Sequence, residues 1–211
     1  FSQNIGVGVR CNNLTMNANS MIRHCYVNST TDGGAGAHIS GILKMSDFAA
    51  ICFNTNINTY GTSIAGRYAV GGAYVKTLEM SGNSSIYGNF SQTKGSSDAS
   101  AKGGAGVYIY GSDDSVISDN ASIRDNFSYY QLCSGVYFPS SKLILADSAS
   151  VVSNSVIPNS MRVPYSQALY GSTLIMSNKA SVVYNGNKVS SSTGEKPDGC
   201  MQVANLFMYD D

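Results

Sequence analysis

Carboxylate side chains are the first candidates for chemistry, because enzymes that cleave polysaccharides need two acids a few ångströms apart, or acids together with calcium and a basic residue. The chain has 13 Asp and Glu residues among 211, with an internal acidic pair at Asp113-Asp114. This pair precedes an apolar stretch, where neighbouring acids are normally solvated turn residues. Asp119 and Asp147 share one turn position in successive repeats, and we expect no earlier acid in their column. Turn geometry therefore explains these acids better than catalysis does.

Histidine and cysteine offer few alternatives. The two histidines, His24 and His38, fall at different positions of the repeat, so they predict neither a metal site nor a catalytic triad. The five cysteines lack the Cys-x-x-Cys spacing that is typical of zinc sites and thioredoxin-like sites. Because five is an odd number, at least one cysteine has no partner within the chain. From these residue types we predict no catalytic residue, no metal site and no cofactor.

The overall composition argues against two classes of partner. Charged residues make up 12% of the chain and the formal net charge is zero, so the basic footprint of a nucleic-acid-binding protein is missing. No stretch approaches 18 consecutive apolar residues, so we predict no membrane span. The 43% of hydrophobic residues at periodic positions provide enough apolar surface for a folded core.

A sequence motif is repeated along the chain, and the place of each residue in its repeat predicts where that residue lies in the fold. It is clearest at Leu78-Glu79-Met80-Ser81, which is followed by Ile86 and Asn89. The aliphatic anchors of the copies are Ile22, Ile51, Ile86, Ile123, Val151 and Val182. A period of about thirty residues is typical of solenoids, in which each repeat stacks on the next. We predict one domain over residues 1–211, with repeats near 5–32, 33–70, 71–102, 103–134, 135–167 and 168–198 and a partial copy at 199–211.

Each repeat contains three short extended stretches separated by turns, and none has the apolar period of a helix. The first stretch reads Gly-x-Tyr-x, the second reads Leu-x-Met, and the third runs from the aliphatic anchor to an asparagine. This pattern corresponds to one turn of a parallel β-solenoid, whose turns stack ~4.8 Å apart. We therefore predict an all-β, single-stranded parallel β-helix of about seven turns with three short strands each.

Stacking should align equivalent residues of successive turns in columns. An asparagine column is expected at the third corner, with amides that hydrogen-bond along the stack: Asn54, Asn89, Asn126, Asn154 and Asn185. Paired glycines precede the first stretch, at a corner that needs positive φ or a close backbone approach: Gly33-Gly34, Gly71-Gly72 and Gly103-Gly104. Cys52 follows the Ile51 anchor and should therefore point outward, so we predict an intersubunit disulfide there.

Two outward columns are candidate functional surfaces. The aromatic column consists of His38, Tyr74, Tyr108, Tyr137 and Tyr170. It either stabilises the stack or offers a face to carbohydrate or to another partner. On the second stretch, the polar residues Thr15, Lys44 and Glu79 are followed by the apolar stripe Val116, Ile144, Ile175 and Phe207. This change predicts that part of the face is covered, by another subunit or by insertions of the chain itself, and we favour a subunit.

The glycine corners and the asparagine column together resemble a known family. A Gly-Gly-Ala corner at Gly34-Ala35, Gly71-Gly72-Ala73 and Gly103-Gly104-Ala105 is followed downstream by a hydrophobic residue, two others and Asn. This pattern resembles the repeats of chlamydial polymorphic membrane proteins, which carry Gly-Gly-Ala and Phe-x-x-Asn motifs. Here Phe1-Ser2-Gln3-Asn4 has the Phe, while the other copies use Ile or Val. The resemblance implies a right-handed parallel β-helix that is exported and acts as an adhesin or a surface-coat element.

The leading functional hypothesis is an extracellular or cell-surface solenoid without enzymatic activity. It would be a subunit of a self-assembling layer, sheath or filament, or an adhesin, with further copies of the chain and host or matrix glycans as partners. The alternative is a carbohydrate-active β-helix enzyme, a polysaccharide lyase or glycosidase, with a site built from the insertions. Phe1-Ser2-Gln3-Asn4 matches the closing stretch of a turn and Leu206-Phe207-Met208 the opening stretch. We therefore expect end-to-end stacking of copies, or a segment of a longer solenoid.

Overall fold

The computed structural model describes residues 4–29, 33–58, 68–93, 103–129, 133–157, 167–183, 186–187 and 201–210. These residues form strands and turns and no helix. Accordingly, none of the described residues belongs to a helix that is long and apolar enough to cross a membrane.

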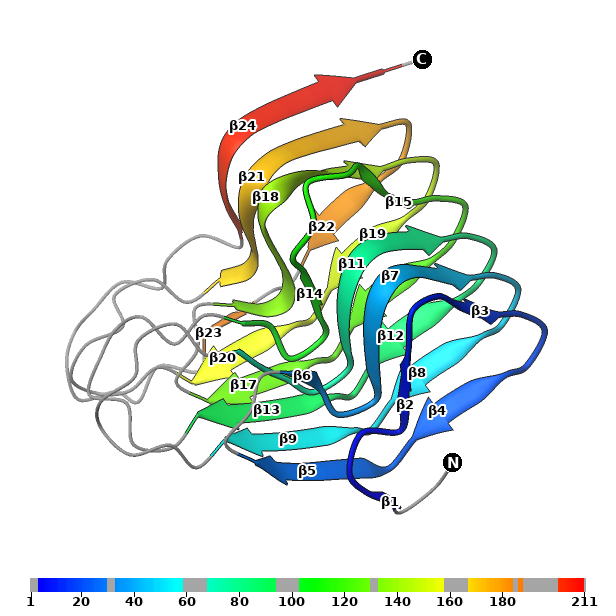
Figure 1. Ribbon diagram of the computed structural model, residues 1–211. Helices are drawn as coiled ribbons and strands as arrows, with labels where there is room; N and C mark the ends of the chain where they lie inside the picture. The colour runs from blue at the N-terminus through cyan, green and yellow to red at the C-terminus, as the bar shows by residue number, and fades with distance from the viewer. Residues whose placement is uncertain are drawn as a thin grey trace, which may run out of the picture.

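The strands stack in parallel into three main sheets, in which strands from successive repeats are neighbours (Figure 1). The seven-stranded sheet contains β1 (Asn4–Ile5), β5 (Cys25–Ser29), β9 (Thr55–Asn58), β13 (Phe90–Thr93), β17 (Phe127–Tyr129), β20 (Ser155–Ile157) and β23 (Gly186–Asn187). The nine-stranded sheet contains β2 (Val9–Cys11), β3 (Leu14–Met16), β7 (Ala37–Met45), β11 (Ala73–Met80), β14 (Val107–Ile109), β15 (Ser115–Ile117), β18 (Cys133–Leu145), β21 (Gln167–Ser177) and β24 (Met201–Tyr209). The six-stranded sheet contains β4 (Met21–Arg23), β8 (Ala50–Cys52), β12 (Ser85–Tyr87), β16 (Ser122–Arg124), β19 (Ser150–Val152) and β22 (Ser181–Val183). β6 (Gly33–Gly34) and β10 (Ala69–Val70) form a separate pair.

The chain thus forms a β-solenoid of about five turns with parallel stacked strands. The N-terminal strands lie at one end of the stack and β24 lies at the other (Figure 1). The first two extended stretches of a turn are continuous in β7, β11, β18 and β21, where we expected separate strands. The ladder between β11 and β7 shows how length differences are absorbed, because Val75 pairs with Ile39 but Thr77 pairs with Ile42. A bulge at the bend accommodates the extra residue without ending the ladder.

The core is built from columns of equivalent aliphatic side chains. The anchor residues align in register across the six-stranded sheet as Ile22, Ile51, Ile86, Ile123, Val151 and Val182. The four central members of this column are fully buried. Full burial of one such side chain stabilises the fold by about 1.5–3 kcal/mol, so the repeat itself supplies the driving force for stacking. The sequence period therefore determines the register of the whole stack.

One corner of the coil is held in the left-handed backbone region and carries Asp119 and Asp147, two of the acids considered above. It contains Ala18, Asp47, Gly82, Asp119, Asp147 and Asn178, with φ from 50° to 63°. Our expectation of no earlier acid in this column was wrong, because Asp47 precedes Asp119 with Gly82 between them. The Asp119 carboxylate accepts a hydrogen bond from the Gly82 amide at 2.8 Å, and Asp47 accepts one from the Ala18 amide at 2.9 Å. These acids link one turn to the next.

Glycines at the corner before the first stretch let two walls of the coil touch. A Cβ atom on Gly106 would lie 2.6 Å from the Gly135 carbonyl oxygen and 2.9 Å from Nδ2 of Asn126. Gly72 has the same kind of environment. Side chains would not fit at this close approach, which is one of the two reasons we expected glycine here. The other reason applies to Gly33, whose φ is +149°.

Candidate functional site

The aromatic column runs through successive turns of the nine-stranded sheet. Strand register pairs His38 with Tyr74, Tyr74 with Tyr108, Tyr108 with Tyr137 and Tyr137 with Tyr170. The centroids of successive rings are 4.9, 5.1, 5.0 and 5.2 Å apart. Each aromatic contact of this kind stabilises by about 0.5–1.5 kcal/mol beyond the area it buries. The column therefore contributes to holding the turns together.

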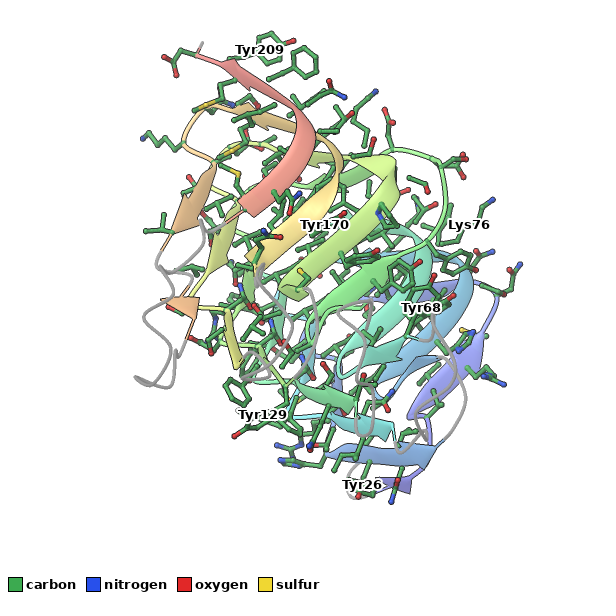
Figure 2. All side chains as sticks on the ribbon, turned by 90° about the vertical axis from the view of Figure 1, so that its left-hand side faces the viewer. Tyr26, Tyr68, Lys76, Tyr129, Tyr170 and Tyr209 are labelled. Carbon is green, nitrogen blue, oxygen red and sulfur yellow. The ribbon has the colours of Figure 1, made fainter. Side chains whose placement is uncertain are left out.

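The middle of the aromatic column is covered by other side chains. Tyr137 and Tyr108 are only 2% and 5% exposed. Tyr68 packs on Tyr108 with ring centroids 4.6 Å apart, and Tyr110 stacks on Tyr74 at 4.8 Å. Figure 2 views the molecule from this side, with Tyr68 labelled. The register directs the column outward, but it does not present five open rings to a ligand.

Burial changes the acidity of the groups in this cluster. Removal from water disfavours a phenolate, so the pKa values of Tyr108 and Tyr137 are raised well above their usual range. A hydrogen bond with Tyr68 raises the pKa of Tyr108 further. Burial also raises the pKa of the Cys133 thiol to about 12. The Cys133 sulfur lies 3.1 Å from each of two backbone carbonyl oxygens, which can accept its single proton. All three groups therefore stay neutral at physiological pH.

The second outward column changes from polar to apolar along the stack. Register aligns Thr15, Lys44, Glu79, Val116, Ile144, Ile175 and Phe207 in successive turns. Lys44 and Glu79 form an ion pair between adjacent turns, with Nζ and Oε2 2.7 Å apart, and both side chains are about half exposed. Such a surface pair contributes at most ~1 kcal/mol. Val116, Ile144 and Ile175 are half-buried, whereas Phe207 is exposed.

A groove with a volume of about 390 Å³ lies over the polar half of this second column. Its lining includes Lys44, Glu79 and Val116 of this column together with the hydroxyl residues Ser46, Ser81 and Ser118. The groove runs across several turns and combines hydroxyl groups with the ion pair. Ligand pockets have volumes of about 300–1,000 Å³, so the groove is large enough for a small polar ligand.

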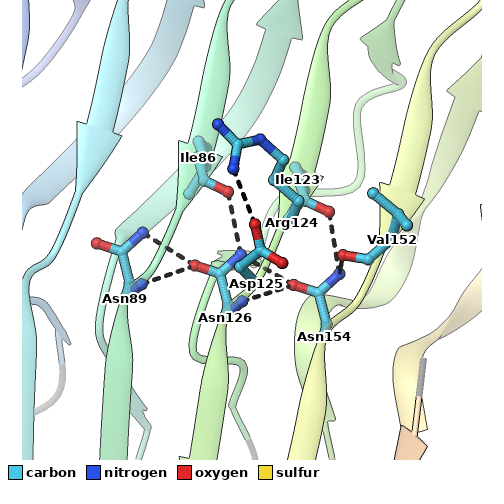
Figure 3. A network of polar contacts seen from close by, with 8 residues as sticks. All are labelled: Ile86, Asn89, Ile123, Arg124, Asp125, Asn126, Val152 and Asn154. Carbon is cyan, nitrogen blue, oxygen red and sulfur yellow. Dashed lines mark hydrogen bonds and ion pairs between the residues drawn. The ribbon is translucent and has the colours of Figure 1, made fainter. Parts of the chain in front are cut away.

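The asparagine column forms a continuous hydrogen-bonded ladder at the third corner (Figure 3). Oδ1 of Asn126 accepts from Nδ2 and from the backbone amide of Asn89, both at 3.0 Å. Nδ2 of Asn126 donates to Oδ1 of Asn154 at 2.9 Å and to the Ile86 carbonyl oxygen at 3.0 Å. Asn54 and Asn89 make the equivalent contacts in their turns, and Asn185 lies outside the described residues. The amides are buried and satisfied, which makes the ladder a structural element.

The internal acidic pair takes part in ion pairs with lysines. Asp113 lies 3.4 Å from Nζ of Lys76, and Asp114 lies 2.8 Å from Nζ of Lys142. Each carboxylate therefore has a basic partner on a neighbouring strand. Within the part of the chain that the structure describes, no group of three or more His, Cys, Asp or Glu side chains is arranged to hold a metal ion.

Cys52 requires a correction. We expected an outward thiol that could form an intersubunit disulfide, but Cys52 is fully buried. Its thiol is hydrogen-bonded with Tyr87, and burial raises its pKa. The four described cysteines, Cys11, Cys25, Cys52 and Cys133, are all free, and Cys200 lies outside the described residues. The alternation of side chains along the strand predicts that Cys52 points out of the core. The thiol is nevertheless buried because neighbouring side chains cover it.

The sequence analysis missed two exposed rings that flank β8. Phe48 is 62% and Phe53 is 50% exposed. Phe53 lies at a corner with positive φ, where other turns have Gly88 and Asp125, residue types that suit this backbone conformation. A comparison of this column across the repeats would have singled out Phe53.

Comparison of the whole chain with family models, curated proteins and solved structures found no significant match.

Proposed function

We propose that this chain is a structural β-solenoid whose copies stack end to end through β24, as the subunit of an extracellular filament, sheath or surface layer. The proposal is supported by the exposure of core positions on β24. Leu206 and Met208 are 43% and 71% exposed, although they are in register with Leu174 and Met176, which are buried. A further turn stacked on β24 would give them the same environment.

The edge of β24 is suited to strand pairing. β24 is the last strand of the nine-stranded sheet and pairs on one side with β21. The backbone amide and carbonyl groups of its other edge can continue the parallel ladder, as exposed edge strands tend to do. Covering Leu206 and Met208 would add about 1.5–3 kcal/mol for each side chain that becomes fully buried.

The N-terminal turn of a second copy matches this edge in side-chain type. Leu14 begins the column that ends in Leu206, and Met16 begins the column that ends in Met208. β2 and β3 lie at the opposite end of the same sheet (Figure 1). Stacking in this way repeats the leucine and methionine columns without a change of register. Because two different surfaces meet, the contact is heterologous and leads to an open filament.

The proposal includes finer features of the molecule and its surroundings. We take the coil to be right-handed, with seven turns of three strands, and to belong with the adhesins and coat proteins that the polymorphic membrane protein resemblance implies. Val116, Ile144 and Ile175 would form lateral contacts between neighbouring stacks. Host or matrix glycans would bind outward faces, and the chain would have no catalytic activity. Release of reducing ends or unsaturated products from a polysaccharide panel would contradict the last statement.

Sedimentation velocity and negative-stain microscopy of the purified chain test the stacking proposal. The wild-type chain should form rods whose length increases with concentration, whereas Leu206→Asp and Met208→Asp should sediment as folded monomers. Lys179→Asp, a charge change at an exposed corner, is the control and should still assemble. Circular dichroism spectra should be the same for all four proteins. A wild-type chain that stays monomeric at high concentration, or a Met208→Asp chain that assembles equally well, would overturn the proposal.

A further inference from the structure

The corner after β8 carries an exposed ring in an unfavourable backbone conformation. Phe53 has a φ of 55° and is half exposed. The equivalent corners hold His24, Gly88, Asp125 and Ser153. Left-handed backbone suits Gly, Asn and Asp, whereas a bulky side chain there is a genuine outlier of the kind that clusters at functional sites. Because Gly, Asn or Asp would form this corner without strain, a half-exposed phenylalanine there points to a role in binding.

The neighbouring turns hold this ring in one orientation. The His24 ring stacks on it with centroids 5.8 Å apart and planes 17° apart. Tyr87 meets it edge-on at 5.1 Å and 81°. A Cβ atom on Gly88 would lie 2.6 Å from a ring carbon of Phe53, so glycine in the next turn leaves the space that the ring occupies. A ring that is already ordered loses little conformational entropy when a ligand binds.

Positive charge lies in the column next to this ring. Arg23, Cys52, Tyr87 and Arg124 occupy one column of the six-stranded sheet in successive turns. The Arg124 guanidinium lies 4.3 Å from the centre of the Tyr87 ring and donates to Asp125 at 2.8 Å (Figure 3). Arg23 is exposed and forms no ion pair with any described residue. Asp125 thus offsets the charge of Arg124, while Arg23 has no such partner among the described residues.

We propose that Arg23, Phe53, Tyr87 and Arg124 form a binding site for an acidic polysaccharide that lies along the stacking axis. The C–H faces of sugar rings pack on aromatic rings, and a guanidinium binds a carboxylate through two parallel hydrogen bonds. Arg23 and Arg124 are three turns apart, which corresponds to about 14 Å at 4.8 Å per turn. A polymer with carboxylates on successive units reaches both arginines, whereas a single sugar acid does not.

The shape of this site favours a linear polymer over a globular partner. The four side chains form a narrow row that follows two adjacent columns across the turns. A globular protein partner needs a surface of about 800 Å² on each side, which is a broad patch and not a row. A polyuronate chain would use the exposed Phe53 ring, the half-buried Tyr87 ring beside it, and the two arginines in line with them.

Affinity electrophoresis and calorimetry with polygalacturonate test this site, with dextran as the neutral polymer and polyglutamate as the acidic peptide. Wild-type protein should bind polygalacturonate, more weakly as salt is added, and should bind neither of the other polymers comparably. Phe53→Asn should weaken binding about tenfold or more, as expected for loss of a central aromatic contact. Because asparagine suits positive φ, this variant should keep its melting temperature. Arg23→Gln should weaken binding and reduce its dependence on salt.

Phe48→Asn is the matched control, because Phe48 is an even more exposed ring on the other side of β8 and lies outside the arginine column. It should bind polygalacturonate as the wild type does. Failure of the wild type to bind polygalacturonate, or full binding by both Phe53→Asn and Arg23→Gln, would overturn the proposal. Equal binding of dextran would overturn the acidic class of ligand, and equal binding of polyglutamate would overturn the assignment to a polysaccharide.

Discussion

Nδ2 of Asn126 lies 2.9 Å from the point where a Cβ atom on Gly106 would stand. Gly106 belongs to the corner before the first stretch and Asn126 to the corner after the six-stranded sheet, so two walls of the coil touch here. The same contact recurs between Gly36 and Asn54, Gly72 and Asn89, and Gly135 and Asn154. The asparagine ladder therefore occupies space that the absence of glycine side chains provides, and each column requires the other.

Gly106→Ala should destabilise the fold by about 1–3 kcal/mol, as overpacking of a filled interior does. The added methyl group would lie 2.6 Å from the Gly135 carbonyl oxygen, so backbone must move to accept it. The free energy of unfolding from urea titration is the measurement. Ser148→Ala, at an exposed turn, is the control and should be neutral within error. Equal stability of Gly106→Ala and wild type would show that the two walls are not in contact.

Asn126→Ala should cost about 3 kcal/mol or more, because several buried groups each lose a partner at about 1–3 kcal/mol. The groups affected are the Asn89 amides, the Asn154 side-chain oxygen and the Ile86 carbonyl. Chemical denaturation followed by circular dichroism provides the number. The comparison is Asn120→Ala, at an exposed corner, for which a much smaller effect is expected. Similar losses for the two variants would contradict the ladder.

Alkaline pH should destabilise the fold through Tyr108 and Tyr137. Their pKa values are raised in the folded chain by burial, so the folded state keeps phenol protons that the unfolded state releases above about pH 10. The stabilisation is complete below pH 10 and is lost as pH rises above it. Melting curves from pH 8 to 11.5 should show a decline that is shallower in Tyr108→Phe and Tyr137→Phe. A decline of the same steepness in these variants would assign the effect to other groups.

Thiol reactivity should follow burial. Brief alkylation of the native protein, mapped by mass spectrometry, should modify Cys11, which is partly exposed, and spare Cys25, Cys52 and Cys133. The three spared thiols are buried and their pKa values are raised, so thiolate is scarce as well as inaccessible. Unfolding in urea should make all of them react. Rapid labelling of Cys52 in the folded chain would show that its thiol is exposed, as we first expected.

Sequence reasoning was most successful where the repeat itself specifies position. Parallel stacking puts equivalent residues of successive repeats next to each other, so the aliphatic anchors and the asparagines could be assigned to columns in advance. It was less successful for Asp47, because Gly82 interrupts the acidic column and hides its continuity. The bend between the first two stretches also varied in length between turns, and the bulge that joins them into one strand could not be read from the motif.

The period, the register and the direction in which each side chain of a strand points all follow from the order of the residues. Alternation along a strand is a local property, so it was sufficient to direct Tyr108 and Cys52 out of the core. Both side chains are nonetheless buried, which the residue order did not reveal, because coverage depends on which side chains from other turns lie above them. The same holds for Phe53, whose fixed orientation results from contacts with His24 in the preceding turn and with Tyr87 and Gly88 in the following turn.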